Sequence, residues 1–147
     1  MSKMRIVTVL TFLFVLSIFN FSGEISAKEI KRELISINKS VKDNGITFKI
    51  TDVFKDGEER LSIEYVIKSE KALKYDKYDV VEKPDVYING KLINHSNTIS
   101  SNKISDKEVR GLIEIMPQKE FPKKFVVKFN LNQVLNQSGQ WTIKFSL

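Results

Sequence analysis

The sequence predicts an all-β protein, an immunoglobulin-like antiparallel β-sandwich of seven or eight strands that follows a signal peptide. Three observations carry this prediction: apolar and polar residues alternate with period two, turn residues separate the alternating runs, and a short apolar segment opens the chain. Successive side chains of a strand point to opposite faces, so each alternating run has one face for the core and one for water. Short strands separated by regular turns are typical of β-sandwiches.

The alternating runs define the expected strands. The last run is an example, because Trp141, Ile143 and Phe145 share one face while Thr142 and Lys144 share the other. A tryptophan that begins such a run is expected to lie in the core. The expected strands cover residues 33–38, 46–53, 60–68, 85–88, 91–94, 107–116, 124–131 and 140–147.

Turn residues occur between these strands. Asn89–Gly90 separates two short apolar runs, and this pair favours a two-residue type I′ turn, whose central residues both need positive φ. Further turns are expected at Asp43-Asn44-Gly45, at Asp56–Gly57 and at Ser138–Gly139. Residues 69–84 and 95–106 are predicted to be long connections, the second because it is rich in Ser and Asn. His95, the only histidine, is therefore expected to be an ordinary surface residue of that loop.

The first 27 residues have the pattern of a secretory signal peptide. Lys3 and Arg5 precede an apolar run over 6–19, and Ile25-Ser26-Ala27 resembles the small-residue cleavage site. We expect cleavage after Ala27 and a single mature domain at 28–147, secreted or associated with the cell envelope. The alternative is an N-terminal membrane anchor, although a spanning helix needs about 20 apolar residues.

Composition excludes several kinds of chemistry. The chain of 147 residues contains no cysteine, which excludes disulfides, thiol nucleophiles and cysteine-ligated metals. Its net charge is +6, and the lysines are spread along the whole chain. Such a surface could attract an anionic wall polymer weakly through its long-range field. Nucleic-acid binding is not expected, because the arginines form no cluster and no recognition motif occurs.

The sequence singles out one candidate contact site, the repeated pattern Lys74-Tyr75-Asp76-Lys77-Tyr78-Asp79. Tyrosine suits protein contact surfaces because it combines an apolar ring with a polar hydroxyl. Lys74, Tyr75, Lys77 and Tyr78 are therefore predicted to form a partner-contact loop. The alternative is that these tyrosines fold back over the end of a sheet.

No catalytic, cofactor-binding or metal site is expected. Carboxylates cluster at Asp52, Asp56, Glu58 and Glu59, and again over residues 76–85, but neither cluster has the spacing of a calcium loop. His95 has no neighbours that suggest a catalytic triad. The chain is therefore predicted not to be an enzyme.

The run from Ser36 to Thr47, continuing to Asp56–Gly57 and Leu61–Tyr65, resembles an extracytoplasmic immunoglobulin-like β-sandwich family of Gram-positive bacteria. This is a domain family of unknown function, often attached to membrane-anchored anti-sigma-factor-like proteins. Phe121–Pro122 and the closing Gly139–Ile143 segment add to the likeness. The resemblance implies the fold and transfers no catalytic residue. Only five residues precede the apolar run and the zinc-binding cysteines are absent, so a direct anti-sigma role is not expected.

These observations favour a secreted, non-enzymatic module that binds a protein or an anionic wall polymer at the bacterial cell envelope, with membrane contact only through the signal peptide. The alternative is a secreted inhibitor of a protease- or lysozyme-type hydrolase, which would present residues 69–84 or 95–106 to its target.

Overall fold

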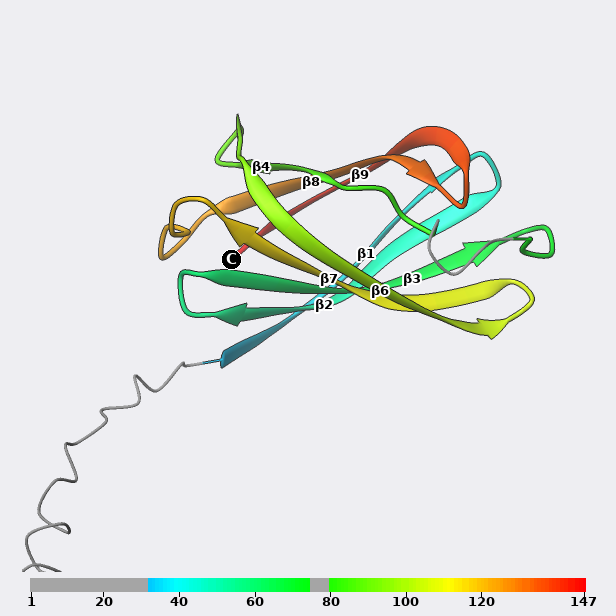
Figure 1. Cartoon of the computed structure of the whole chain (residues 1–147), viewed down its shortest axis with the longest axis horizontal. Coiled ribbons are helices and arrows are strands. Elements are labelled where there is room, and N and C mark those ends of the chain that lie inside the picture. The colour runs from blue at the N-terminus through cyan, green and yellow to red at the C-terminus, as the bar shows by residue number, and fades with distance from the viewer. Residues whose placement is uncertain (1–31, 75–79) are drawn as a thin grey trace, which may run out of the picture.

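The protein is a β-sandwich of two antiparallel sheets, as the sequence predicts (Figure 1). The computed structural model describes residues 32–74 and 80–147. The larger sheet has five strands in the order β1-β2-β3-β7-β6, and the smaller has four in the order β5-β4-β8-β9. The strands are β1 (Arg32–Asp43), β2 (Ile46–Asp56), β3 (Arg60–Ser69), β4 (Asp85–Ile88), β5 (Lys91–Leu92), β6 (His95–Ser105), β7 (Glu108–Pro117), β8 (Val126–Val134) and β9 (Gln137–Ser146).

The core lies between the two sheets and is built from the apolar positions of the alternating runs. Trp141, Tyr65, Phe48 and Phe129 are its largest fully buried side chains. The Phe48 ring stacks on Tyr65 with 5.5 Å between centroids, and on Phe129 with 5.8 Å. Phe48 therefore joins the two sheets, since Tyr65 belongs to β3 and Phe129 to β8. The prediction that Trp141 is a core residue is confirmed.

Two of the predicted hairpin turns are confirmed by their backbone angles. Asn44 and Gly45 have φ of 48° and 74°, and Asn89 and Gly90 have φ of 51° and 82°. Positive φ at both central residues is the requirement of a type I′ turn, which matches the twist of the flanking strands.

The predicted turn at Ser138–Gly139 is wrong. The chain turns at Leu135 and Asn136, with φ of 52° and 59°, and both Ser138 and Gly139 lie inside β9. Gly139 serves close packing there, because a Cβ atom would lie 2.6 Å from the Trp141 ring and 2.8 Å from Asp43 Oδ2. Burial of the Leu135 side chain, which is 8% exposed, holds that residue in the turn.

The prediction of seven or eight strands is also too low, because residues 95–105 form β6 where a loop was expected. Its pairing with β7 runs from His95 opposite Pro117 to Lys103 opposite Val109 without a register shift. Most of its core-facing positions are polar, so the alternation that marks the other strands is absent. Ile99 is the apolar residue that packs against the core.

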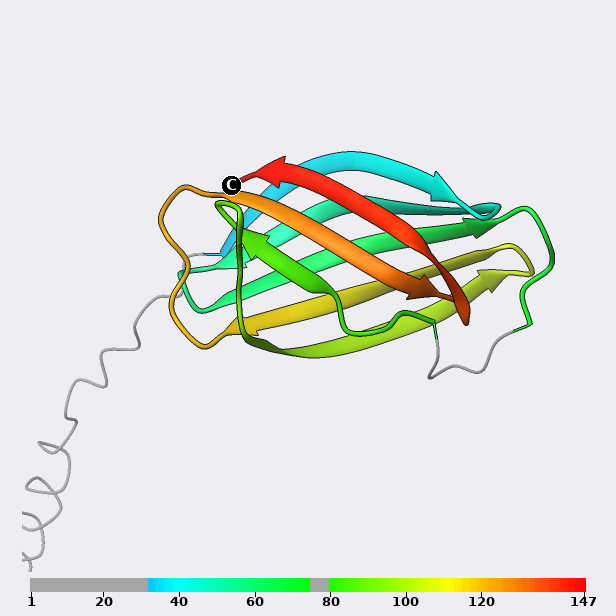
Figure 2. The ribbon, with the colours of Figure 1, turned by 90° about the horizontal axis from the view of Figure 1, so that it is seen from above.

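The sandwich has two flanks, and β1 lies beside β9 along one of them (Figure 2). Lys39 Nζ donates a 2.7 Å hydrogen bond to the Lys144 carbonyl, and Asn44 Nδ2 donates one of 2.7 Å to the Ser138 carbonyl. These contacts join the edges of the two sheets along what we call the β1–β9 flank.

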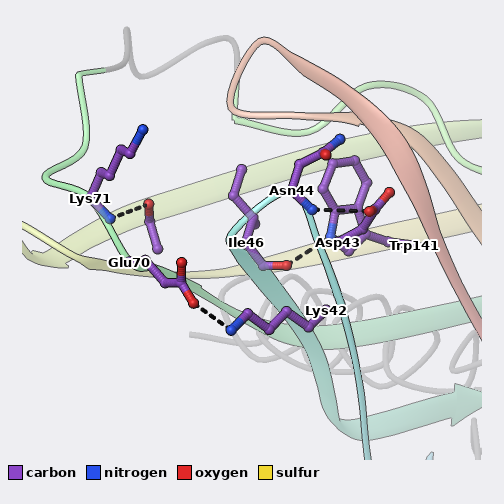
Figure 3. Close-up of polar contacts among 8 residues, drawn as sticks. Lys42, Asp43, Asn44, Ile46, Glu70, Lys71 and Trp141 are labelled. Carbon is purple, nitrogen blue, oxygen red and sulfur yellow. Dashed lines mark hydrogen bonds and ion pairs between the residues drawn. The ribbon is translucent and has the colours of Figure 1, made fainter.

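A cluster of hydrogen bonds holds one end of the β1–β9 flank (Figure 3). The Trp141 indole donates a 3.0 Å hydrogen bond to the Ile46 carbonyl. The Asp43 carboxylate accepts hydrogen bonds from the backbone N–H of Asn44 at 3.0 Å and of Gln140 at 2.8 Å. The first hairpin turn is thus attached to the start of β9.

Candidate functional site

The outer face of the five-stranded sheet contains a hollow of about 460 Å³. It extends across β2, β3, β7 and β6, so rigid paired strands position its side chains. Outer-face positions contribute hydroxyl, amide, carboxylate and guanidinium groups together with two apolar side chains. The lining residues are Thr51, Asp52, Glu64, Tyr65, Val66, Ser100, Asn102, Arg110, Gly111 and Leu112. This set, which we call the sheet hollow, is the candidate functional site.

A β-bulge in β2 places two polar residues at one side of the sheet hollow. Ile50 pairs with Tyr65 and Val53 pairs with Ile63, so Thr51 and Asp52 together oppose the single residue Glu64. Thr51 Oγ1 donates a 3.3 Å hydrogen bond to the Glu64 carbonyl. The bulge thus brings the Asp52 side chain to the same region of the face as the Glu64 carboxylate.

The side of the sheet hollow nearer β6 depends on Gly111. Tyr65 pairs with Gly111 across β3 and β7, and the Tyr65 hydroxyl donates a 3.1 Å hydrogen bond to the Ser100 carbonyl in β6. A Cβ atom on residue 111 would lie 2.4 Å from this hydroxyl and 2.1 Å from that carbonyl. Glycine is therefore required for Tyr65 to reach across β7 and hold β6 in place.

The charges in the sheet hollow are unevenly compensated. Arg110 Nε lies 2.9 Å from Glu108 Oε1, so its guanidinium already has a carboxylate partner. Asp52 and Glu64 are partly buried, and neither carboxylate forms an ion pair with any residue of the described ranges 32–74 and 80–147. A ligand with a cationic group would therefore find two carboxylates that are not engaged in an ion pair with the described residues.

A second hollow, of about 300 Å³, lies at the end of the sandwich where β5 leads into β6. Its lining includes two lysines and no acid: Lys91, Leu92, Ile93, Asn94, Pro117, Gln118 and Lys119. The Leu92 side chain is 53% exposed there. Connecting segments build most of this hollow, whereas strands build the sheet hollow.

Of the predicted partner-contact residues, the structure describes one. Lys74 is exposed at the end of the described segment after β3, while Tyr75, Lys77 and Tyr78 lie outside the described residues. Ala27, the predicted cleavage position, also lies outside them. The grouping of these four side chains into a contact loop therefore remains a prediction.

The expectation for His95 is wrong. Its side chain is buried, at 6% exposed, and begins β6 instead of lying in a loop. The Nε2 atom lies 3.0 Å from the Pro84 carbonyl and the Nδ1 atom 3.3 Å from the Ser96 carbonyl. The ring therefore attaches the start of β6 to the segment before β4, which gives His95 a structural role.

Two exposed carboxylates have altered acidity through neighbouring lysines. A hydrogen bond and the charge of Lys42 hold the pKa of Glu70 below its ordinary value (Figure 3). Lys103 lowers the pKa of Asp106 in the same way, with 2.9 Å between Nζ and Oδ1. None of these four side chains lines the sheet hollow.

The described ranges contain no group of three or more His, Asp or Glu side chains placed to hold a metal ion. Nor do residues 32–74 and 80–147 include a helix that is long and apolar enough to cross a membrane.

The sheet hollow was not predicted from the sequence, although one signal for it exists. Residues Ile46 to Thr51 alternate regularly, and then Thr51 and Asp52 place two polar residues together before Val53. Such a break in period two marks a β-bulge, which is the feature that brings Asp52 towards Glu64.

No family model matches the chain, and no curated protein matches it. A similar fold occurs in the crystal structure of the conserved domain protein from Bacillus anthracis, with a TM-score of 0.59 and 19% sequence identity. The similarity covers 78% of this chain and 41% of that one, so this chain matches less than half of its neighbour's length. At this identity the likeness shows the fold alone.

Proposed function

We propose that this protein is a secreted, non-enzymatic binding module of the bacterial cell envelope that holds a partner protein at the sheet hollow. The observation that carries the proposal is the hollow itself. It is about 460 Å³ in volume, and four paired strands hold its hydroxyl, amide and carboxylate groups in fixed positions. Rigid placement lowers the ordering cost of binding. The leader pattern of the first 27 residues and the family resemblance support an extracytoplasmic location.

The charges of the sheet hollow favour a protein over an anionic wall polymer. The Asp52 and Glu64 carboxylates would repel phosphate or carboxylate groups of such a polymer, and they complement a lysine or arginine side chain of a partner. We therefore expect the partner to present a cationic side chain to these two residues. The lysine-rich surface elsewhere would attract anionic polymers only weakly, through long-range field.

The inhibitor hypothesis ranks second because half of its structural basis is absent. It offered residues 69–84 or 95–106 as the loop presented to the target, and residues 95–105 are instead a paired strand. Only the segment over 69–84 could still be presented to a hydrolase.

A charge-matched comparison tests the proposal. The wild-type protein is immobilised and used to isolate ligands from envelope extract, and each purified ligand is then titrated by calorimetry. We expect the D52N/E64Q variant to bind the partner at least about tenfold more weakly, since each hydrogen bond to a charged group contributes about 1.5–3 kcal/mol. The control is E33Q/E59Q, which removes two exposed carboxylates outside the hollow and should bind normally.

Two results would contradict the proposal. If D52N/E64Q binds more tightly than wild type and E33Q/E59Q does the same, the ligand is an anionic polymer attracted by net charge. If the protein turns over a wall or peptide substrate and one point mutation abolishes turnover, the protein is an enzyme.

A further inference from the structure

The two sheets of the sandwich differ in how their charged side chains are compensated. The ion pairs among the described residues all join side chains of the larger sheet or of the turns beside it. The strands of the smaller sheet have one carboxylate, Asp85, and three lysines, Lys91, Lys128 and Lys144. None of these four side chains forms an ion pair within residues 32–74 and 80–147. The strands of the smaller sheet therefore carry an excess of positive charge.

Four side chains form a row across the outer face of the smaller sheet. Leu92 pairs with Tyr87, and Tyr87 pairs with Lys128. Lys128 in turn pairs with Lys144. Residues that pair directly lie on the same face of a sheet, and the residues on either side of Tyr87, Lys128 and Lys144 are buried. This set, which we call the lysine row, thus lies on the side of the sandwich opposite the sheet hollow (Figure 1).

The pairing of β8 with β9 places two like charges directly opposite each other. The Phe125 and Leu147 backbones exchange two hydrogen bonds of 2.8 Å, and bonded and non-bonded pairs alternate along an antiparallel ladder. Lys128 and Lys144, three steps along this ladder, are therefore a non-bonded pair, in which side chains lie closer together. Like charges in this position are destabilising. An anionic group bound between the two ammonium groups would relieve the repulsion.

The surroundings of the two lysines suit a hydrated ligand. The Lys128 ammonium lies 4.6 Å from the centroid of the Tyr87 ring, a cation–π contact that keeps it on the outer face. From residue 128 onward in β8 and from residue 140 onward in β9, every outward side chain is polar. The exposed Leu92 lies two strands away from Lys128. Binding to a lipid surface usually buries apolar side chains, so this face favours a hydrated polymer.

We infer that an anionic wall polymer lies along the lysine row, with one of its phosphate or carboxylate groups between the Lys128 and Lys144 ammonium groups. The row crosses four strands spaced about 4.8 Å apart, which suits a stretch of an extended chain. Asp85 faces outward opposite Asn130 and accepts a 3.2 Å hydrogen bond from the Asn132 amide, so the lysines outnumber it on this face. This local contact would add to the weak long-range attraction of the other lysines.

The inference rests on the proposed function only for the location that supplies a wall polymer. The contacts themselves are independent of it, because no residue of the lysine row lines the sheet hollow. A partner protein held at the sheet hollow should therefore bind the K128Q/K144Q variant normally. Loss of polymer binding and loss of partner binding are thus separate results.

Fluorescence anisotropy of a labelled polyphosphate chain, titrated with the protein, tests the site. Wild type should bind saturably at about 0.01 M salt and more weakly at about 0.15 M, because salt screens exposed charges. K128Q/K144Q should bind about tenfold more weakly than wild type at the lower salt concentration, since each exposed ion pair contributes up to about fivefold. K128R/K144R keeps both charges and should retain binding.

A charge-matched control distinguishes a local site from attraction by net charge. K71Q/K107Q removes the same charge from two exposed lysines outside the smaller sheet. Neither lysine has an ion-pair partner in the part of the chain that the structure describes. This variant should bind polyphosphate within about twofold of wild type.

Thermal unfolding gives a second measurement on the same variants. Without polyphosphate, K128Q/K144Q should have a higher thermal midpoint than wild type, because the like-charge repulsion is removed. Polyphosphate should raise the midpoint of wild type more than that of K128Q/K144Q, since a ligand stabilises the state that binds it. A lower midpoint of the free variant would show that the two lysines do not repel each other, and would contradict the inference.

Three binding results would also overturn it. Equal weakening by K128Q/K144Q and K71Q/K107Q would attribute binding to net charge. A wild-type protein without saturable binding up to about 1 mM at the lower salt concentration would have no such site. Binding to vesicles of phosphatidylcholine and phosphatidylglycerol, without binding to polyphosphate, would assign the lysine row to a membrane surface.

Discussion

The two flanks of the sandwich are closed in different ways. Along the β1–β9 flank, side chains such as Lys39 and Asn44 donate hydrogen bonds to backbone carbonyls of the opposite sheet. Along the flank formed by β6, which we call the β6 flank, the His95 ring contacts the Pro84 carbonyl, in the segment before β4, at 3.0 Å. The β1–β9 flank is thus joined by side chains near both ends of β9, while the contact described for the β6 flank lies at the start of β6. The difference predicts that the β1–β9 flank contributes more to stability than the β6 flank.

The largest expected effect concerns the β1–β9 flank and follows removal of Trp141. The side chain is fully buried, so W141A leaves a cavity and should lower the free energy of unfolding by about 3–5 kcal/mol. W141F keeps most of the packing and loses the hydrogen bond to the Ile46 carbonyl, so it should lower the free energy of unfolding by about 1–2 kcal/mol. Urea unfolding measures both losses. It is followed by far-UV circular dichroism, because Trp141 is the only tryptophan and neither variant retains its fluorescence. Equal stability of the two variants would contradict this account.

On the β6 flank, G111A is expected to have the next largest effect. The new methyl group would lie 2.1 Å from the Ser100 carbonyl, so β6 must move, and overpacking of this kind costs about 1–3 kcal/mol. Thermal unfolding measures the loss, and amide exchange should rise in β6 more than in β9. The double variant Y65F/G111A removes the hydroxyl clash but keeps the clashes with the Ser100 carbonyl at 2.1 Å and with the ring carbon Cζ of residue 65 at 2.5 Å, so it should recover little of the loss. Full recovery would show that β6 does not need to move.

The hydrogen bonds of Asp43 are expected to contribute less. D43A removes the acceptor for the N–H groups of Asn44 and Gln140, which can then bind water, and we expect a loss of about 1 kcal/mol. D43N retains an acceptor oxygen, so its free energy of unfolding should lie between those of wild type and D43A. Chemical denaturation measures both variants, and a D43A protein as stable as wild type would show that β9 is held by packing alone.

The smallest expected effect is that of the exposed pair Lys42–Glu70, whose side chains are 56% and 62% exposed. Such pairs contribute little because water screens them. The pKa of Glu70 is lowered in the folded state, so the contribution is present above the ordinary value of 4.5 and is lost as pH falls through the folded pKa. The small difference between wild-type and K42A thermal midpoints should therefore vanish at low pH. An E70Q variant should show no such pH dependence.

The sequence predicted the parts of the fold that local patterns determine. Asn89–Gly90 identified its turn because only positive φ at both positions permits that hairpin. Gly139 was misassigned because a glycine required for close packing looks the same as a turn glycine, and the contact that explains it is with Trp141 and Asp43. β6 was missed because His95, Asn97 and Ser101 face the core side with polar side chains. Neither error could be corrected without the tertiary contacts.

The candidate site was less predictable than the fold. Asp52 was noted as one member of an acidic cluster with Asp56, but Asp56 is paired with Arg32 at 2.9 Å. The bulge in β2 places Asp52, and not Asp56, opposite Glu64. Asp52 and Glu64 lie in the same hollow only because β2 pairs with β3 in this register. Proximity across a sheet depends on register, which a single sequence does not specify when the bulge is unrecognised.

The pairing of β3 with β7 has a kinetic consequence. The hairpins β2–β3 and β6–β7 each join neighbouring segments, but the larger sheet is complete only when Lys68 meets Glu108 across the whole intervening chain. Closing a long loop before its contacts are gained slows folding, and sandwiches fold in roughly milliseconds to seconds. Assembly of the two preformed hairpins is thus expected to limit the folding rate. Substitutions along the pairing of β3 with β7 should therefore slow refolding more than substitutions near the chain termini.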